Sequence, residues 1–213
     1  MLPRYVFEGG AVLECDFEND LSNGKGSLKM PDGTHYKGAF KDGCMHGKGV
    51  MRSRGATYKG AFADNLFHGK GKLTFPSGDT YSGAFQRHAF HGKGAYNWRS
   101  GKRYEGTFAR GKLTGAGVYT WSEGQKYTGT YVNGKREGQG ELAGAYGQHY
   151  EGSWEDGEPH GEGVFTSSNS EYVEGDFHRG RYVDPDHVEA TSPTSGLGSL
   201  FGGGASNSKL HIT

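Results

Sequence analysis

Four histidines stand immediately before a glycine, and histidine nitrogens are common protein ligands for zinc. They are His46, His68, His91 and His160. The first three follow one another at intervals of 22 and 23 residues. If each interval is one two-stranded unit, neighbouring histidines start about 10 Å apart, whereas zinc needs nitrogens at about 2.1 Å. The spacing therefore predicts a structural role, in the loop before each glycine, and no metal site.

Two other patterns could carry chemistry. The segment Gly47–Gly49 and its copies are glycine-rich, as phosphate-binding loops are, but they precede expected strands and lack the helix N-terminus of a phosphate cradle. A run of carboxylates forms a surface cluster, without a partner that would tune one of them for catalysis. That run is Glu151, Glu155, Asp156 and Glu158. We therefore predict no catalytic residue, no enzyme activity and no cofactor.

The histidines belong to a larger repeat, which begins with the pattern aromatic-x-Gly-x-aromatic. In Tyr81–Phe85, the two rings and Gly83 alternate with other residues, so they share one face of a strand. The period is 23 residues, with one step of 22, and degenerate copies begin near residues 13 and 173. The six leading tyrosines are Tyr36, Tyr58, Tyr81, Tyr104, Tyr127 and Tyr150. Regular self-similarity of this kind predicts stacked supersecondary units.

Turn residues predict that each unit is a β-hairpin. Asp42-Gly43 is a strong signal for a two-residue turn, because both central residues of such a turn need positive φ. Arg87-His88 stands in the same place and is less favourable, although histidine is enriched at positive φ. The glycines within the strands are expected to leave room for an aromatic ring from the next strand to lie flat across them.

The repeat resembles the MORN (membrane occupation and recognition nexus) family, whose signature is Tyr-x-Gly-x-(Trp/Phe)-x-x-Gly-x-x-His-Gly-x-Gly. The resemblance covers about residues 13–180, with Phe mostly in place of Trp, and with Thr114 and Glu137 at the histidine position. It implies an all-β fold: an elongated single-layer antiparallel sheet of stacked hairpins with about eight repeats. Repeats are expected to start near 13, 36, 58, 81, 104, 127, 150 and 173. Residues 1–12 are an expected lead-in, and residues 181–213 an expected flexible Gly/Ser-rich tail.

The resemblance also implies a non-enzymatic scaffold for protein–protein contacts. The order of the repeats around Tyr81 and Tyr127 is similar to that in radial spoke head MORN proteins, which implies a cytoskeletal location in the axoneme of a cilium or flagellum. Partners would be other subunits of a large assembly, and terminal sheet edges would pair with a second copy or a similar protein. We expect partly exposed rings to bind partners: Tyr36, Phe40, Tyr58, Phe62, Tyr81, Phe85, Tyr104, Phe108, Tyr127, Tyr131, Tyr150 and Trp154.

Charge leaves an alternative open. Residues 25–103 hold 15 Lys or Arg against 4 Asp or Glu, while residues 104–189 hold 7 against 15. The asymmetry fits an ordinary solvated surface, end-to-end pairing, or a basic half that faces tubulin tails or anionic phospholipid. In the lipid alternative the protein is a membrane-associated scaffold, and the expected contacts are Lys37, Lys59, Lys70 and Lys72. A net charge of zero argues against nucleic acid as a partner. Cys15 and Cys44 are expected to be free thiols inside the cell.

Overall fold

The computed structural model describes residues 2–183, which form two compact units that divide after Arg99. Residues 2–183 contain strands and no helix. Unit 1 holds β1 (Arg4–Val6), β2 (Val12–Glu18), β3 (Leu21–Lys29), β4 (His35–Lys41), β5 (Cys44–Ser53), β6 (Ala56–Ala63), β7 (Leu66–Thr74), β8 (Thr80–Gln86) and β9 (Ala89–Asn97). Unit 2 holds β10 (Arg103–Ala109), β11 (Lys112–Thr120), β12 (Lys126–Val132), β13 (Lys135–Ala143), β14 (His149–Glu155), β15 (Glu158–Thr166), β16 (Tyr172–His178) and β17 (Arg181–Tyr182).

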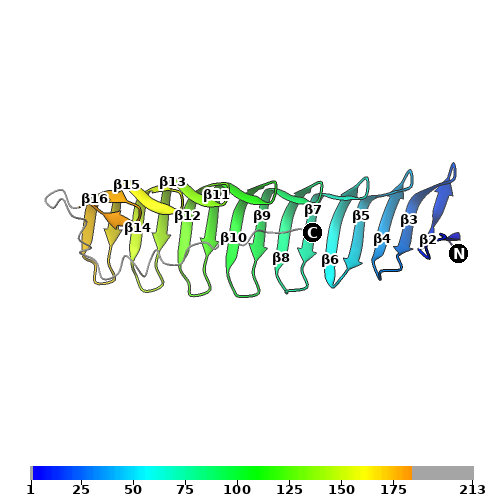
Figure 1. Ribbon diagram of the computed structural model, residues 1–213, viewed down its shortest axis with the longest axis horizontal. Coiled ribbons are helices and arrows are strands. Elements are labelled where there is room, and N and C mark those ends of the chain that lie inside the picture. The colour runs from blue at the N-terminus through cyan, green and yellow to red at the C-terminus, as the bar shows by residue number, and fades with distance from the viewer. Residues whose placement is uncertain (1, 184–213) are drawn as a thin grey trace. The chain divides into compact units, whose positions relative to one another are not determined.

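Each unit is an antiparallel sheet in which every strand pairs with the next strand along the chain (Figure 1). Within residues 2–183, one hairpin forms per repeat, from β2–β3 in unit 1 to β16–β17 in unit 2. The predicted all-β sheet of hairpins is therefore confirmed. Of the predicted 181–213 tail, Arg181 and Tyr182 form β17, and residues 184–213 lie outside the described residues.

The hairpin turns have the predicted geometry. Asp42 and Gly43 have φ of 49° and 81°, and Arg87 and His88 have φ of 51° and 69°. All four lie in the left-handed region that a two-residue hairpin turn of this kind requires at both central positions. Turns in both units also reach the preceding repeat: the Gly43 N–H donates to the Ser22 carbonyl at 3.1 Å, and the Gly157 N–H donates to the Arg136 carbonyl at 3.0 Å. The turns thus join neighbouring hairpins along the edge of the sheet.

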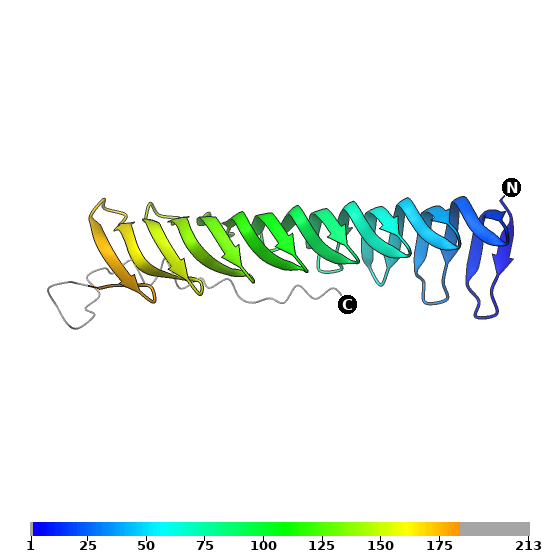
Figure 2. The same ribbon diagram turned by 90° about the horizontal axis from the view of Figure 1, so that it is seen from above.

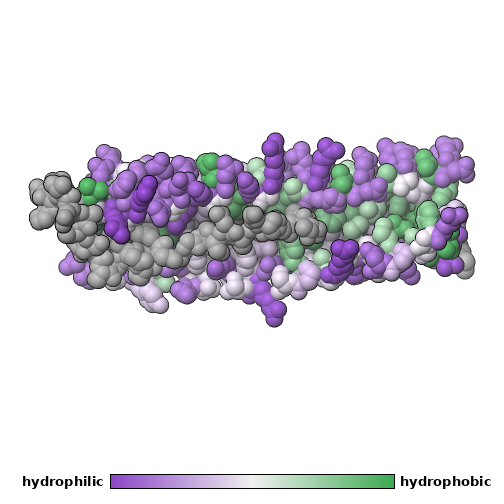
Figure 3. All heavy atoms as spheres, viewed as in Figure 1, coloured by the Kyte–Doolittle hydropathy of each residue, from purple (hydrophilic) through white to green (hydrophobic). Residues whose placement is uncertain are grey.

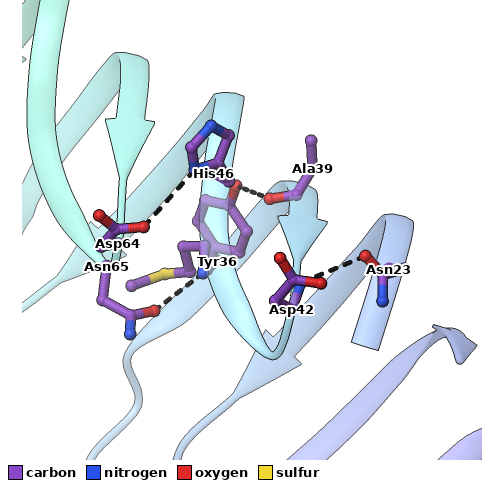
Figure 4. A network of polar contacts seen from close by, with 8 residues as sticks. Asn23, Tyr36, Ala39, Asp42, His46, Asp64 and Asn65 are labelled. Atoms are coloured by element: carbon purple, nitrogen blue, oxygen red, sulfur yellow. Dashed lines mark hydrogen bonds and ion pairs between the residues drawn. The ribbon is translucent and has the colours of Figure 1, made fainter. Parts of the chain in front are cut away.

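In two turns whose second residue is not glycine, the side chain of that residue accepts an extra hydrogen bond. Asn65 Oδ1 accepts from the Met45 N–H at 2.8 Å (Figure 4), and His88 Nδ1 accepts from the Phe67 N–H at 3.3 Å. The His88 ring also packs edge-on against the Phe67 ring at 4.6 Å. These contacts offset the strain of positive φ at a residue with a Cβ atom.

A pH-dependent effect is expected at His88. Burial lowers the pKa of this histidine, and its contribution to stability is full above the unfolded value of about 6.5 and lost as the pH falls through the lowered folded value. His88→Asn keeps an acceptor, as Asn65 does, without titrating. We expect urea unfolding to show equal stability of the two proteins at pH 7.5, and a wild-type deficit of roughly 0.5 kcal/mol at pH 5.

His91, an exposed histidine in the same hairpin, supplies the control. His91→Asn, measured at the same two pH values, shows whether the effect is specific to His88. A pH-independent difference between wild type and His88→Asn would show that the His88 ring is not an obligate acceptor.

A register shift, typical of a β-bulge, bends each hairpin from β2–β3 to β14–β15 next to the histidine position and its glycine. In β4–β5, Gly38 lies opposite Gly49 while Ala39 lies opposite His46, so two residues of β5 are skipped. One of them, Gly47, has φ of 63°, a conformation that favours glycine. Matching glycines have positive φ in the later repeats: Gly69, Gly92, Gly115, Gly138 and Gly161. Bulges bend the strand that carries them, and the strands of both units are strongly curved (Figure 2).

The leading tyrosine of each repeat fits this bend. Tyr36 Oη donates to the Ala39 carbonyl at 2.7 Å, where the register shifts (Figure 4). A Cβ atom built on Gly38 would lie 2.3 Å from Tyr36 Oη, and one on Gly49 would lie 2.4 Å from Tyr36 Cε2. The ring therefore lies flat across both glycines. It comes from the same strand as Gly38 and from the strand paired with that of Gly49, so the expected ring from a neighbouring strand is found at the second glycine and is wrong for the first.

Other side chains close over the tyrosines from the opposite side. The Phe67 ring stacks on Tyr58 at 3.8 Å and 9°, and Phe90 stacks on Tyr81 at 3.8 Å and 17°. Burial raises the pKa of Tyr58 to about 12. On the face of the molecule drawn in Figure 3, hydrophobic side chains gather along the middle over β3–β7, with hydrophilic side chains along the margins. Each bent sheet thus builds a narrow aromatic core.

The two terminal repeats lack the tyrosine, and each fills the space differently. Leu13 stands in the tyrosine position, and the buried Cys15 occupies the place of the first glycine. At the other end, the Tyr182 ring lies 3.2 Å from the position of a Cβ atom on Gly175. The expected lead-in contains one further strand, because β1 pairs with β2. This exposed strand of three residues blunts the edge that was expected to recruit a partner.

Candidate interaction surface on unit 1

The twelve aromatic residues predicted to bind partners are core residues. Their side chains are only 0–6% exposed, so the expected partial exposure is wrong. The reason is the bend at each register shift, which lets Phe67 and its equivalents cover the rings from the other side. Phe85 illustrates the packing, since its ring meets Tyr58, Tyr81 and Phe90 edge-on at 5.0–5.6 Å. Direct partner contact by these rings stays a prediction and would require the sheet to open.

The opposite face of unit 1 carries lysines in two cross-strand rows. Along one row, Lys37 pairs with Val50, Val50 with Lys59, and Lys59 with Lys72. Along the other, Lys48 lies opposite Ala61, and Lys70 lies opposite Ala84. We call six exposed lysines of these rows the basic face: Lys37, Lys48, Lys59, Lys70, Lys72 and Lys93.

A groove of about 920 Å³ runs through the basic face. Five lysines border it: Lys48, Lys59, Lys70, Lys72 and Lys93. Its floor consists of the paired strand glycines together with Val50, Ala61 and Ala84. The glycines that accept the tyrosine rings on one face thus leave backbone accessible on the other. The groove can therefore hold an anionic chain close to the sheet.

The charge of the basic face is not neutralised within the described part of the chain. Across residues 2–183, none of its six lysines forms an ion pair. Lys59 and Lys72 even stand directly opposite each other, an arrangement of like charges that destabilises a sheet. The face therefore favours an anion supplied from outside.

Of the four lysines predicted to contact an anionic surface, three border the groove. Lys59, Lys70 and Lys72 line it, and Lys37 lies beside it, opposite Val50. The prediction missed Lys48 and Lys93, although each stands in the Gly-Lys-Gly segment of its repeat. Their position between two inward-facing glycines was the available signal, because it places a side chain outward.

The recurring histidines lie within strands rather than in loops, and they are not brought together. His46 Nδ1 is 3.9 Å from Asp64 Oδ1, on the following hairpin (Figure 4). In residues 2–183, no group of three or more His, Cys, Asp or Glu is arranged to hold a metal ion. Cys15 and Cys44 are free, as predicted, and burial raises the pKa of Cys15. None of the described residues forms a helix suited by length and apolarity to crossing a membrane.

Three solved structures show how far the likeness in fold extends. The TCP domain of Drosophila melanogaster SAS-4 (dCPAP), in complex with a proline-rich motif of Ana2, has a TM-score of 0.43 and 11% identity over 71% of this chain and 84% of that chain. The G-box domain of the microcephaly protein CPAP has a TM-score of 0.45 and 12% identity over 82% and 97% of the two chains. The TCP10 domain of Danio rerio CPAP has a TM-score of 0.40 and 16% identity over 82% and 94%. At these TM-scores the likeness carries no argument about function.

Sequence comparison gives a clearer result. No match was found among curated proteins. The MORN repeat profile matches residues 16–35, 36–55, 58–80, 81–103, 104–126, 127–145 and 150–172, which together make up well over half of the sequence. The degenerate copy near residue 173 has no match of its own but forms β16 and β17. The chain belongs to the MORN repeat family.

Proposed function

We propose that this protein is a non-enzymatic scaffold that binds an acidic segment of a partner protein in the groove of the basic face. MORN repeats suggest a scaffold that binds proteins or membranes. The observation that carries the proposal is the row of lysines that form no ion pair within residues 2–183, around a groove floor that includes glycine, alanine and valine. Because the aromatic face is buried, the outward face with its lysines is the surface on which a partner can bind.

The groove suits an extended acidic segment in three ways. Its glycine floor lets a second backbone approach closely. Val50, Ala61 and Ala84 offer shallow apolar contacts between the charges. Lysine stems pack along apolar surface while their ammonium groups stay in water, so the border can follow carboxylates of a partner. Charges of one sign along a groove also accelerate the encounter with an anionic partner.

We further propose that the partner belongs to a ciliary or flagellar axoneme. The support is the similarity of the repeat order around Tyr81 and Tyr127 to radial spoke head MORN proteins. The protein would then act in the cytoskeleton, as one subunit of a large assembly. Pairing through a terminal strand edge remains part of this proposal, with β17 offering only two paired residues at the C-terminal side of unit 2.

Anionic phospholipid is a second candidate, because the same uncompensated lysines would attract it. A lipid surface would engage the exposed ammonium groups and would not need the groove floor. The proposed protein ligand needs both. A substitution on the floor can therefore separate the two candidates.

Binding measurements test these alternatives directly. The triple variant Lys59→Glu, Lys70→Glu and Lys72→Glu should bind a labelled polyglutamate peptide about tenfold or more weakly than wild type. The matched control changes three exposed basic residues outside the groove lining, Lys29, Lys41 and Arg52, to Glu. It should bind close to the wild-type level.

A floor variant decides the kind of ligand. Ala61→Gln fills part of the groove, keeps every lysine, and should weaken peptide binding while leaving phosphatidylserine vesicle binding unchanged. Vesicle binding without peptide binding by wild type would favour lipid. Equal loss of peptide binding in the groove and control variants would show that overall charge alone determines binding. It would contradict the groove as the binding site.

A further inference from the structure

Unit 2 carries acidic residues at the strand positions that hold lysines in unit 1. The residue after the leading aromatic position is Lys37 or Lys59 in unit 1, and Glu151 or Glu174 in unit 2. The residue between the two glycines is Lys70 in unit 1 and Glu162 in the last full repeat of unit 2. We call five exposed residues of unit 2 the acidic face: Glu141, Glu151, Glu162 and Glu174, which stand at lysine positions of unit 1, and Asp176, which stands at the position of Ala61.

The acidic face has the same cross-strand organisation as the basic face. Glu141 lies directly opposite Glu151, and Glu162 lies directly opposite Asp176. Like charges in this arrangement destabilise a sheet. Among residues 100–183, only Glu141 of this set has an ion-pair partner, His149 Nε2 at 3.1 Å. A cationic surface from outside the unit would relieve the repulsion.

The two faces also match in spacing. Both consist of hairpins of the same repeat, so charges recur at about 10 Å on each, twice the strand separation. A row of lysines can therefore contact a row of carboxylates over several repeats, because the two rows have the same spacing. The whole chain has a net charge of zero, which is the balance expected where each charged face has its complement on an identical molecule.

We propose that the basic face of one copy binds the acidic face of a second copy of this chain. The inference rests on the proposed function, since it names a partner for the same lysines. It differs from pairing through strand edges, because side chains and not backbone groups make the contact. Lysine ammonium groups and the carboxylates of Glu151, Glu162 and Glu174 form the contact, so salt weakens it.

Charge reversal with mixing tests the inference. The first variant changes Lys37, Lys59, Lys70 and Lys72 to Glu, which makes both faces acidic. The second changes Glu141, Glu151, Glu162 and Glu174 to Lys, which makes both faces basic. In sedimentation velocity at low ionic strength, wild type should associate, and each variant alone should associate on the order of 100-fold more weakly, because juxtaposed like charges are strongly unfavourable. An equimolar mixture of the two variants should associate again.

Two controls keep the inference open to contradiction. Circular dichroism should show a wild-type β spectrum for both variants, because all eight substituted side chains are exposed. If a variant fails to fold, the salt series on wild type decides: association must weaken as ionic strength rises. Monomeric wild type at every protein concentration in low salt, or a mixture that stays monomeric although both variants fold, overturns the inference.

The labelled polyglutamate peptide separates this result from the proposed function. Peptide binding by a wild-type protein that stays monomeric would overturn self-association and leave the acidic-partner scaffold standing. Association of wild type without peptide binding would support the second copy as the partner and contradict a general site for acidic segments. Absence of both would overturn both.

Discussion

Alanine in place of Gly94 is expected to lower the free energy of unfolding by about 3 kcal/mol, although it adds a single methyl group to a strand. The φ angle of Gly94 is not in the left-handed region, so an alanine there causes no backbone strain. Its Cβ atom would lie 2.5 Å from Tyr81 Oη, and 2.7 Å from Cε2 and Cζ of the same ring. Tyr81 is fully buried and stacks on Phe90, so its ring cannot move aside without breaking that stack.

A double-mutant cycle isolates this cause. Tyr81→Leu removes the ring and should itself destabilise by about 3 kcal/mol, but it also frees the space above Gly94. In that background Gly94→Ala should cost less than about 1 kcal/mol. The first repeat offers a precedent, since Leu13 stands in the tyrosine position there and Cys15 occupies a glycine position. Urea unfolding followed by circular dichroism measures all four proteins.

Gly9→Ala is the matched control, because a Cβ atom there would meet nothing within 4 Å and φ is not positive. It should unfold like wild type. Additive effects of Gly94→Ala and Tyr81→Leu would mean that the ring is not the obstacle, and that the strand glycine serves backbone geometry alone.

The repeat and its hairpins could be predicted because two local signals agree. A 23-residue period fixes the unit, and turn pairs such as Asp42-Gly43 fix where the chain reverses. The glycine positions were also informative, and the origin of the ring was assigned to the wrong strand only for the first glycine of each hairpin. The contact between Tyr36 and Gly38 is local, within one strand, yet alternation alone says only that both face the same side.

The burial of the rings could not be predicted, and the expected partial exposure is wrong for that reason. A flat single layer would leave one side of each ring exposed. The register shift at Gly47 and its equivalents bends the strand, and a bend is a property of paired strands that one strand's pattern does not encode. The lysines of the basic face were partly found, since outward positions follow from alternation. The groove between them depends on the same paired glycines.

Arg136 is a buried core residue that the sequence patterns did not predict. It lies in the position held by Phe67, Phe90 and Leu113 in earlier repeats, and its side chain is only 6% exposed. Its Nη2 donates to the Gly157 carbonyl at 2.6 Å. Sequence patterns do not predict the burial of this arginine, because an isolated charged residue among polar strand residues is typical of a solvated surface.

Aromatic rings compensate the buried charge of Arg136. The guanidinium carbon lies 4.4 Å from the Trp154 ring centroid and 5.6 Å from that of Tyr127. Cation–π contacts of this kind strengthen when the cation is removed from water. Burial lowers the pKa of Arg136, but arginine remains protonated at neutral pH. The position therefore combines a desolvation penalty with a planar stacking contact.

Truncation and replacement at Arg136 should have very different effects. Arg136→Ala leaves a cavity over the Tyr127 and Trp154 rings and is expected to lower the free energy of unfolding by about 3 kcal/mol. Arg136→Leu reproduces Leu113 of the preceding repeat and removes the buried charge. It should stay within about 1 kcal/mol of wild type, because well-packed apolar residues can replace buried charges without net loss. Urea unfolding of both variants, followed by the fluorescence of Trp98, Trp121 and Trp154 together, measures the two effects. If leucine were as damaging as alanine, the cation itself, through its bond to Gly157 and its stacking on Trp154, would hold this repeat together, and shape alone would not.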